Sequence, residues 1–128
     1  MSALRVLVVD DEPDFLQMIR VRLESEHYEV VTAAGGREAF ELMKKFPPDA
    51  VLLDIMMPDM DGLEVLRKIR RSHKDLPVFM LTAFSDGKRF AAARKLNASG
   101  FVTKTDWMGE GMKNVTSALR LCARFKSR

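Results

Sequence analysis

Short apolar runs and longer amphipathic stretches alternate along the chain. The short runs are rich in β-branched and aliphatic residues, and several are apolar throughout, which is typical of strands covered on both faces. They fall at residues 4–9, 28–33, 50–53, 78–81 and 100–102. Apolar residues spaced three and four apart predict helices after each run, at residues 13–26, 36–46, 62–72, 86–96 and 109–125. The pattern therefore predicts five strand–helix pairs.

Proline, asparagine and glycine mark the ends of these segments. Pro13 suits a first helical turn, Pro47 and Pro48 stop a helix before the third strand, and Asn97 and Gly100 follow the fourth helix. Strands that alternate with helices favour right-handed crossovers and a parallel sheet with helices on both faces. We therefore predict an α/β fold with three layers.

Length and composition favour a single domain. With 128 residues, 47% of them hydrophobic, the chain can bury one sizeable core but is too short for two ordinary domains. We expect one domain over residues 1–128, without an output domain. No stretch approaches the roughly 20 apolar residues that span a bilayer, and the N-terminus lacks the features of a secretion signal. A cytoplasmic protein that does not insert in membranes is expected.

Charge is distributed unevenly between the two halves of the chain. Residues 1–64 contain 14 acidic and 6 basic side chains, whereas residues 65–128 contain 15 basic and 4 acidic ones. A cation site in the first half and a basic, partner-facing surface in the second would explain this distribution. Ordinary solvated faces would explain it as well, so charge alone leaves both interpretations open.

Carboxylates follow two of the predicted strands directly. Asp10, Asp11 and Glu12 come after the first strand, and Asp54 comes after the third. The ligand crevice of an open parallel sheet lies beyond the carboxyl ends of its strands. If these two strands are neighbours, the carboxylates converge and repel one another unless a cation or protons intervene. Mg²⁺, which prefers hard oxygen ligands, is the expected ion, and Mn²⁺ is an alternative.

The remaining strands end in groups of complementary chemistry. The fourth strand ends in the hydroxyl of Thr82, and the fifth leads to the ammonium of Lys104. Taken singly, each residue has an ordinary interpretation: Asp10 or Glu12 as a helix cap, for example, or Lys104 as a solvated lysine. Together, acids, a hydroxyl and an ammonium are the groups that phosphoryl transfer requires, because they position and neutralise the phosphoryl oxygens.

Four motifs carry a resemblance to a known family. They are Val-Val-Asp-Asp-Glu-Pro at 8–13, Asp-Ile-Met-Met-Pro-Asp-Met-Asp-Gly at 54–62, Leu-Thr-Ala at 81–83 and Phe-Val-Thr-Lys at 101–104. With these motifs the sequence resembles the response-regulator receiver (CheY-like) domains of two-component phosphorelay signalling, over essentially its whole length. The resemblance implies a flavodoxin-like (βα)5 sandwich whose five-stranded parallel sheet has the order 2-1-3-4-5.

The resemblance also implies roles for individual residues. Asp54 would be the phosphoacceptor, and Lys104 would contact the phosphoryl group. Asp11, Asp54 and the backbone carbonyl of Met56 would bind the metal directly, with Asp10 acting largely through water. Beyond self-phosphorylation with Mg²⁺ and slow autodephosphorylation, such a domain is not an enzyme.

A switch and its partners follow from the same resemblance. Thr82 would move to hydrogen-bond the phosphoryl oxygen, and Phe101 would turn inward, which alters the face formed by the fourth helix, fifth strand and fifth helix. The donor would be a sensor histidine kinase or a histidine phosphotransfer protein. The downstream effector would be a protein, and the basic fourth and fifth helices favour an acidic one. The basic C-terminus lacks a recognition motif, so direct nucleic-acid binding is not expected.

The sequence departs from the family at several positions. Thr105 stands where the family usually has a proline with a cis bond, so we expect a trans or differently built loop. Phe101 replaces the commoner tyrosine. Met56 and Phe84 are apolar where the family's hydrolytic water passes, which predicts a long-lived phosphoaspartate. Gly62 is expected to adopt a backbone conformation closed to bulkier residues.

Two other functions are alternatives to a phosphorylatable receiver. A phosphohydrolase of the haloacid-dehalogenase type also forms an aspartyl phosphate, but its Asp-x-Asp-x-Thr motif is not matched by the residues that begin at Asp54. A degenerate receiver that binds partners without phosphorylation remains an alternative, because the proline after Lys104 is missing.

Overall fold

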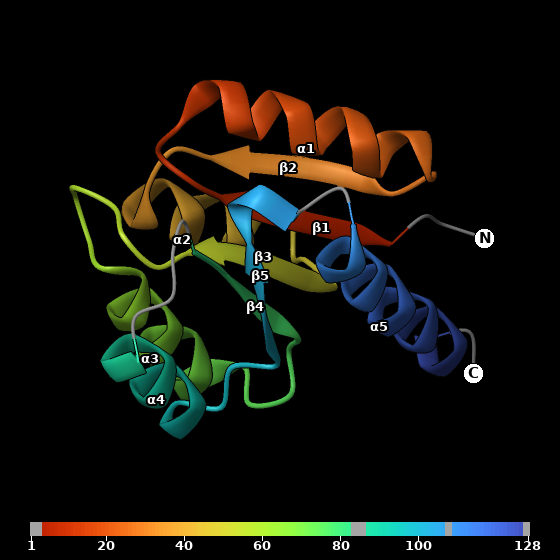
Figure 1. The fold of residues 1–128 in the computed structure, drawn as a ribbon. Helices are drawn as coiled ribbons and strands as arrows, with labels where there is room; N and C mark the ends of the chain where they lie inside the picture. Colours follow the sequence, from red (N-terminus) through yellow and green to blue (C-terminus); the bar gives the residue numbers. More distant parts are fainter. Residues whose placement is uncertain (1–3, 83–86, 107–108, 127–128) are drawn as a thin grey trace.

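The computed structural model describes residues 4–82, 87–106 and 109–126, and it contains one parallel sheet (Figure 1). The strand order is β2-β1-β3-β4-β5, as expected. The strands are β1 (Arg5–Val9), β2 (Glu29–Ala33), β3 (Ala50–Asp54), β4 (Val78–Thr82) and β5 (Gly100–Thr103). All four neighbouring pairs are parallel. The predicted α/β class and strand order are confirmed.

Helices cover both faces of the sheet. They are α1 (Pro13–Ser25), α2 (Gly36–Lys45), α3 (Gly62–Ser72), α4 (Gly87–Lys95) and α5 (Glu110–Lys126), with a short 3-10 helix η1 (Lys104–Asp106) after β5. In Figure 1, α1 and α5 lie on one face, while α2, α3 and α4 lie on the other. Each predicted strand and helix is present with its ends within one residue of expectation, and η1 was not predicted.

Two hydrophobic cores, one on each face, hold these layers together. Phe15, Ile19 and Leu23 of α1, spaced four residues apart, pack in the core beneath α1 and α5. Along β3 the side chains alternate, so that Leu52 enters this core and Leu53 enters the core beneath α2, α3 and α4. Each fully buried aliphatic side chain stabilises the fold by about 1.5–3 kcal/mol relative to an exposed one. The sheet centre is therefore the most constrained part of the molecule.

Register brings the carboxyl ends of the central strands to one edge of the sheet. Val9 at the end of β1 lies opposite Leu53 of β3, and Asp54 lies opposite Leu81 of β4. Asp10, which directly follows β1, and Thr82, the last residue of β4, therefore lie beside the end of β3. Asp10 continues this alignment, since its backbone N–H donates to the Ala33 carbonyl at the end of β2, at 3.0 Å.

Two helices end with a residue in the left-handed conformation. His27 after α1 has φ 71°, and Asn97 after α4 has φ 63°. In both cases the N–H of this residue and the N–H of the next one donate to carbonyls of the last helical turn, as in a Schellman motif. Asparagine tolerates this conformation, which explains why Asn97 marked the helix end in the sequence. His27 gave no such signal, so the first helix was predicted one residue too long.

Candidate functional site

Two buried carboxylates lie at the centre of the sheet edge. Asp10 is fully buried and Asp54 is 4% exposed, whereas Asp11 and Glu12 are exposed. Each buried carboxylate is oriented by a backbone N–H two residues further on: Glu12 donates to Asp10 Oδ1 at 2.8 Å, and Met56 donates to Asp54 Oδ1 at 3.2 Å. These local bonds form because the chain turns immediately after each strand. They leave Oδ2 of both carboxylates facing a common partner, Lys104.

The Lys104 ammonium lies among three carboxylates. Its Nζ atom is 2.8 Å from Asp10 Oδ2 and 3.3 Å from Asp54 Oδ2, and it also donates to Glu12 Oε1. The side chain is only 12% exposed, and Nζ lies 5.1 Å from the centre of the Phe15 ring. No cis peptide bond occurs in the described ranges, and η1 begins at Lys104 itself. The Lys104–Thr105 bond is therefore not cis, and Lys104 reaches Asp54.

Burial and mutual repulsion shift the titration of these groups. Burial, with the neighbouring Asp10 charge, raises the pKa of Asp54 to about 6, while Lys104 opposes the shift. Burial also raises the pKa of Asp10, again against the effect of Lys104. Burial alone would lower the pKa of Lys104, but its hydrogen bonds with Asp10 and Glu12 raise it above the usual value. The ammonium therefore stays charged at neutral pH, whereas Asp54 retains some proton affinity.

The donor set suits a hard divalent cation. Carboxylate oxygens of Asp10, Asp11 and Glu12 come within 4.8 Å of one another, and Asp54 faces the same Lys104 ammonium as Asp10. One ammonium offsets only part of this negative charge, and carboxylate oxygens are the ligands that Mg²⁺ prefers. Met56 presents an exposed side chain, 54% accessible, and is linked to Asp54 through its backbone. The residues at this edge fit a magnesium ion.

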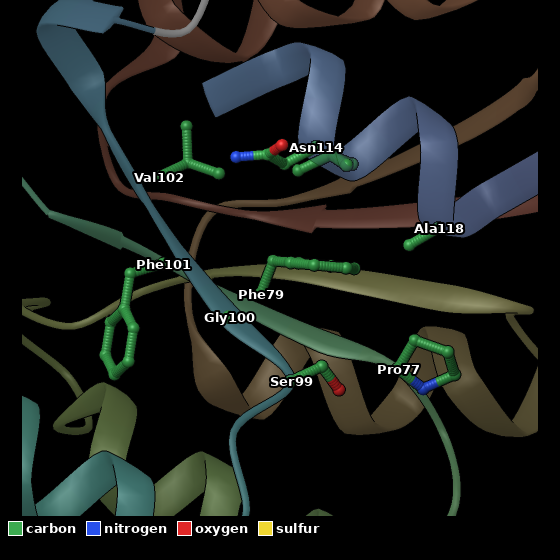
Figure 2. A pocket seen from close by; sticks show the side chains of 9 residues that line it. Pro77, Phe79, Ser99, Gly100, Phe101, Val102, Asn114 and Ala118 are labelled. Atoms are coloured by element: carbon green, nitrogen blue, oxygen red, sulfur yellow. The ribbon is translucent and has the colours of Figure 1, made fainter. Parts of the chain in front are cut away.

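Thr82 and Phe101 lie near this edge on β4 and β5. Thr82 is buried at the end of β4, opposite Thr103 of β5. The Phe101 ring packs against Phe90 of α4, with ring centres 4.4 Å apart. Figure 2 shows the Phe101 ring on the opposite side of β5 from Val102, which faces α5. Phe101 also borders a groove of about 480 Å³ between β5 and α5.

The loop from β3 to α3 is attached to three helices. Asp59 accepts long hydrogen bonds, 3.4 Å each, from the Gly36 and Arg37 N–H groups at the start of α2. Asp61 caps α3 by accepting from the Leu63 N–H at 2.9 Å. The Asp61 carboxylate also pairs with Arg89 of α4. The loop that follows Asp54 is therefore held in place by two aspartates, Asp59 and Asp61.

Gly62 has a different role from the one predicted. Among the described residues no glycine has a positive φ, so the expectation of a special backbone conformation is wrong. The requirement is space: a Cβ on Gly62 would lie 2.0 Å from the carbonyl oxygen of Asp54. Glycine is needed because α3 begins in direct contact with the end of β3.

Sequence reasoning missed the partner of Glu12. Glu12 occupies the N-cap position of α1, yet its side chain makes no capping hydrogen bond there and instead binds Lys104. The acidic run at residues 10–12 was visible in the sequence. A partner 92 positions away was not, because periodicity carries no information about which charges meet. Phe84, also noted in the sequence, lies outside the described residues.

Comparison with known proteins identifies the family. The sequence matches the family described as "Response regulator receiver domain" over residues 6–116. It is 37% identical over 115 residues to the transcriptional regulatory protein KdpE of Mycobacterium tuberculosis, covering 90% of this chain and 50% of that protein. The chain spans about half the length of the curated relatives that it matches.

Solved structures show the same fold. Chemotaxis protein CheY4 of Vibrio cholerae superposes with a TM-score of 0.81 at 30% identity, covering 92% of this chain and 98% of that one. Response regulator TrrA of Thermotoga maritima, solved in complex with Mg²⁺-BeF, has a TM-score of 0.79 at 35% identity and covers 91% and 98%.

Receiver domains are signalling modules of two-component response regulators rather than classical enzymes, and they bind Mg²⁺ at an acidic pocket. In the part of this chain that the structure describes, none of the helices has the length and apolar character needed to span a bilayer. The chain belongs to the response regulator receiver domain family.

Proposed function

We propose that this chain accepts a phosphoryl group on Asp54, from a histidine kinase or a histidine phosphotransfer protein, in a reaction that depends on Mg²⁺. The phosphorylated domain then binds a downstream protein differently. The observation that carries this proposal is the contact between the Lys104 ammonium and Asp54 Oδ2, 3.3 Å apart in a pocket shared with buried Asp10. An ionised carboxylate at a strand end, with a fixed cation beside it, is arranged to receive a phosphoryl group.

The chemistry requires Asp54 in its ionised form. Its carboxylate oxygen attacks the phosphorus, the bond from phosphorus to the donor's imidazole nitrogen breaks, and that nitrogen keeps the electron pair. Because the other ring nitrogen of the phosphohistidine carries a proton in this step, the products are an aspartyl phosphate and a neutral histidine. With a pKa of about 6, Asp54 is mostly ionised at neutral pH. The Lys104 ammonium neutralises part of the charge on the transferring oxygens without any change of its own protonation.

The metal site involves residues on two strand ends. Asp11, Asp54 and the backbone carbonyl of Met56 would bind the ion directly, and buried Asp10 would act largely through water. When bound, Mg²⁺, or Mn²⁺ in its place, supplies positive charge that offsets the phosphoryl oxygens and the crowded carboxylates. The shifted pKa of Asp54 supports this arrangement, because a carboxylate crowded by another acid gains from a nearby cation.

The switch is proposed to pass through Thr82 and Phe101. A phosphoryl group adds roughly 1.5 to 2 negative charges, which attract the Thr82 hydroxyl at the end of the neighbouring strand. Phe101 then turns inward and leaves its contact with Phe90 of α4. The face formed by α4, β5 and α5 changes as a result.

The downstream partner is proposed to be an acidic protein. Among the side chains of α4 and α5 that the structure describes, the exposed bases are Lys88, Arg94, Lys95, Lys113 and Arg120. Two copies of this face would repel each other in a symmetric pair, whereas an acidic surface would be attracted to it.

The test is intact-mass spectrometry after incubation with acetyl phosphate, with and without Mg²⁺. We expect one added phosphoryl group that requires Mg²⁺, is absent from Asp54→Asn and persists in Asp59→Asn, which changes an aspartate of the same loop. If folded wild-type protein gains no mass, the proposal is wrong, and the chain is instead a receiver that acts by binding alone.

A further inference from the structure

Glu12 is placed at the entrance of the acidic pocket by its neighbours in the sequence. Pro13 restricts the residue before it to extended conformations, and Glu12 has φ −96° and ψ 107°. The Glu12 N–H is bound to Asp10 Oδ1, so the backbone is fixed at this point. The Glu12 side chain is 61% exposed, whereas the Lys104 side chain bound to it is 12% exposed. A surface carboxylate thus holds an ammonium that lies beneath it.

The Lys104 ammonium is not centred on Asp54. Its Nζ atom is 3.3 Å from Asp54 Oδ2 but 2.8 Å from Asp10 Oδ2, and it makes its shortest contact with Glu12. The Phe15 ring, 5.1 Å from Nζ, supports the ammonium from the side of α1. Glu12 and Phe15, both at the start of α1, therefore draw Lys104 toward the entrance of the pocket.

A lysine ammonium and a divalent cation compete for the same carboxylates. Two positive ions on Asp10 and Asp54 repel each other, so a metal ion binds more easily when the ammonium has another counter-ion. Glu12 is the one acid of the cluster at residues 10–12 that is not expected to bind the metal. It offers Lys104 a counter-ion that Mg²⁺ would not need, while Lys104 stays within reach of Asp54.

We infer that Glu12 is a positioning residue: it draws the Lys104 ammonium, which also pairs with Asp10 and Asp54, toward the pocket entrance and thereby makes it easier for Mg²⁺ to displace the ammonium from the buried carboxylates. The inference rests on the proposed magnesium site. Without Glu12, Asp10 and Asp54 are the remaining partners of the ammonium, which then binds them more tightly and opposes the entry of the metal. Glu12 thus raises the affinity for Mg²⁺ through Lys104, beyond the general attraction of one more negative charge.

Calorimetric titration of the whole chain with MgCl₂ tests this inference. Glu12→Gln removes the counter-ion and keeps the shape of the side chain. Asp14→Asn is the matched control, because it removes an exposed acid two positions along the chain. Lys104→Met, with Lys104→Gln as a second version, removes the competing ammonium. Circular dichroism confirms that each variant is folded.

The expected pattern is a coupling between two residues. Glu12→Gln weakens Mg²⁺ binding by about fivefold to tenfold, the effect of losing a partly buried charged hydrogen bond. Asp14→Asn weakens it by about twofold or less, since exposed charges are screened. In a chain that lacks the Lys104 ammonium, Glu12→Gln has only the small effect of the control.

Three outcomes overturn the inference. If Glu12→Gln and Asp14→Asn have equal effects, Glu12 contributes charge alone, and the proposed magnesium site still stands. If the effect of Glu12→Gln persists without the lysine, Glu12 acts on the metal directly. If the folded wild-type chain does not bind Mg²⁺, the proposed function fails together with this inference.

Discussion

Arg89 of α4 and Asp61 of the β3–α3 loop form an ion pair, with 3.0 Å between Nη1 and Oδ2. Because the other oxygen of Asp61 caps α3 through the Leu63 N–H, this one carboxylate connects the first turn of α3 with the first turn of α4. The chain from Asp54 reaches Asp61 within one short loop. A shift of α4 away from α3 therefore has to break the pair or strain the cap.

Loss of this pair is expected to favour the phosphorylated conformation. The two side chains are 30% and 46% exposed, so the pair contributes about 0.5–1 kcal/mol at most. Arg89→Gln should accordingly speed phosphorylation by acetyl phosphate about twofold to fivefold, measured by intact mass over time. Arg94→Gln, an exposed arginine of the same helix, should leave the rate unchanged. A slower rate in Arg89→Gln would mean that the pair supports the active conformation instead.

The stability of the metal-free protein should fall as the pH rises through the titration of Asp54. Its pKa is raised from 3.8 to about 6 by folding, so the native state binds this proton more tightly than the unfolded chain does. The resulting stabilisation is complete below about pH 4 and is lost as the pH passes 6. Between pH 5 and 7 the loss amounts to about 1 kcal/mol.

Urea unfolding in EDTA at pH 5 and pH 7 measures this contribution. The decrease in unfolding free energy between the two pH values should be about 1 kcal/mol smaller in Asp54→Asn, which has no proton to lose. Added Mg²⁺ should stabilise the wild type more at pH 7 than at pH 5, since protons compete with the metal. Equal pH dependence in both proteins would show that Asp54 titrates normally.

The phosphoaspartate is expected to persist for minutes or longer. Met56 lies beside the acceptor, linked to Asp54 by its backbone, and its side chain has no group that orients an attacking water. Met56→Gln should shorten the lifetime by about tenfold, because an amide can hold that water. Met57→Gln makes the same chemical change at the next residue and should have little effect. A wild-type half-life of seconds, followed by intact mass after removal of the donor, would contradict this prediction.

Gly62→Ala should destabilise the fold by about 2–4 kcal/mol. The Cβ of the new alanine would overlap the Asp54 carbonyl oxygen. The contact is between two backbone segments, β3 and the start of α3, and moving either one costs free energy. Gly87→Ala is the control: nothing lies within 4 Å of a Cβ at the start of α4, so this variant should be neutral or slightly more stable. Urea unfolding of both variants decides the point, and equal stabilities would show that β3 and α3 separate easily.

The fold could be predicted from the sequence because local signals agreed with the global arrangement. Apolar runs defined all five strands, and residues such as Pro13 and Asn97 marked helix ends within one position. Parallel strands end at the same edge of a sheet, so Asp10 and Asp54 could be predicted to lie close together if their strands are neighbours. The structure pairs β1 with β3. These features depend on backbone geometry, which the spacing of apolar residues along the chain directly reflects.

Pairings between side chains could not be predicted from the sequence. Nothing in it distinguishes Arg89 from the other arginines as the partner of Asp61, or Glu12 from other acids as the partner of Lys104. The hydrogen bonds from the start of α2 to Asp59 were equally hidden, since they join this helix to the β3–α3 loop, which only the fold brings beside it. Such choices depend on distances of a few ångströms in a packed structure.

The position of β5 at the border of the sheet has a mechanical consequence. Asp10 and Asp54 are attached to β1 and β3, each of which is hydrogen-bonded on both sides. Phe101 belongs to a strand of four residues that is bonded to β4 alone. A displacement of this strand disturbs a single ladder of backbone bonds, whereas the same displacement of β3 would disturb two. The proposed phosphorylation site thus lies on the most firmly bonded strands of the sheet, whereas Phe101, the proposed switch residue, lies on a border strand that can move at lower energetic cost.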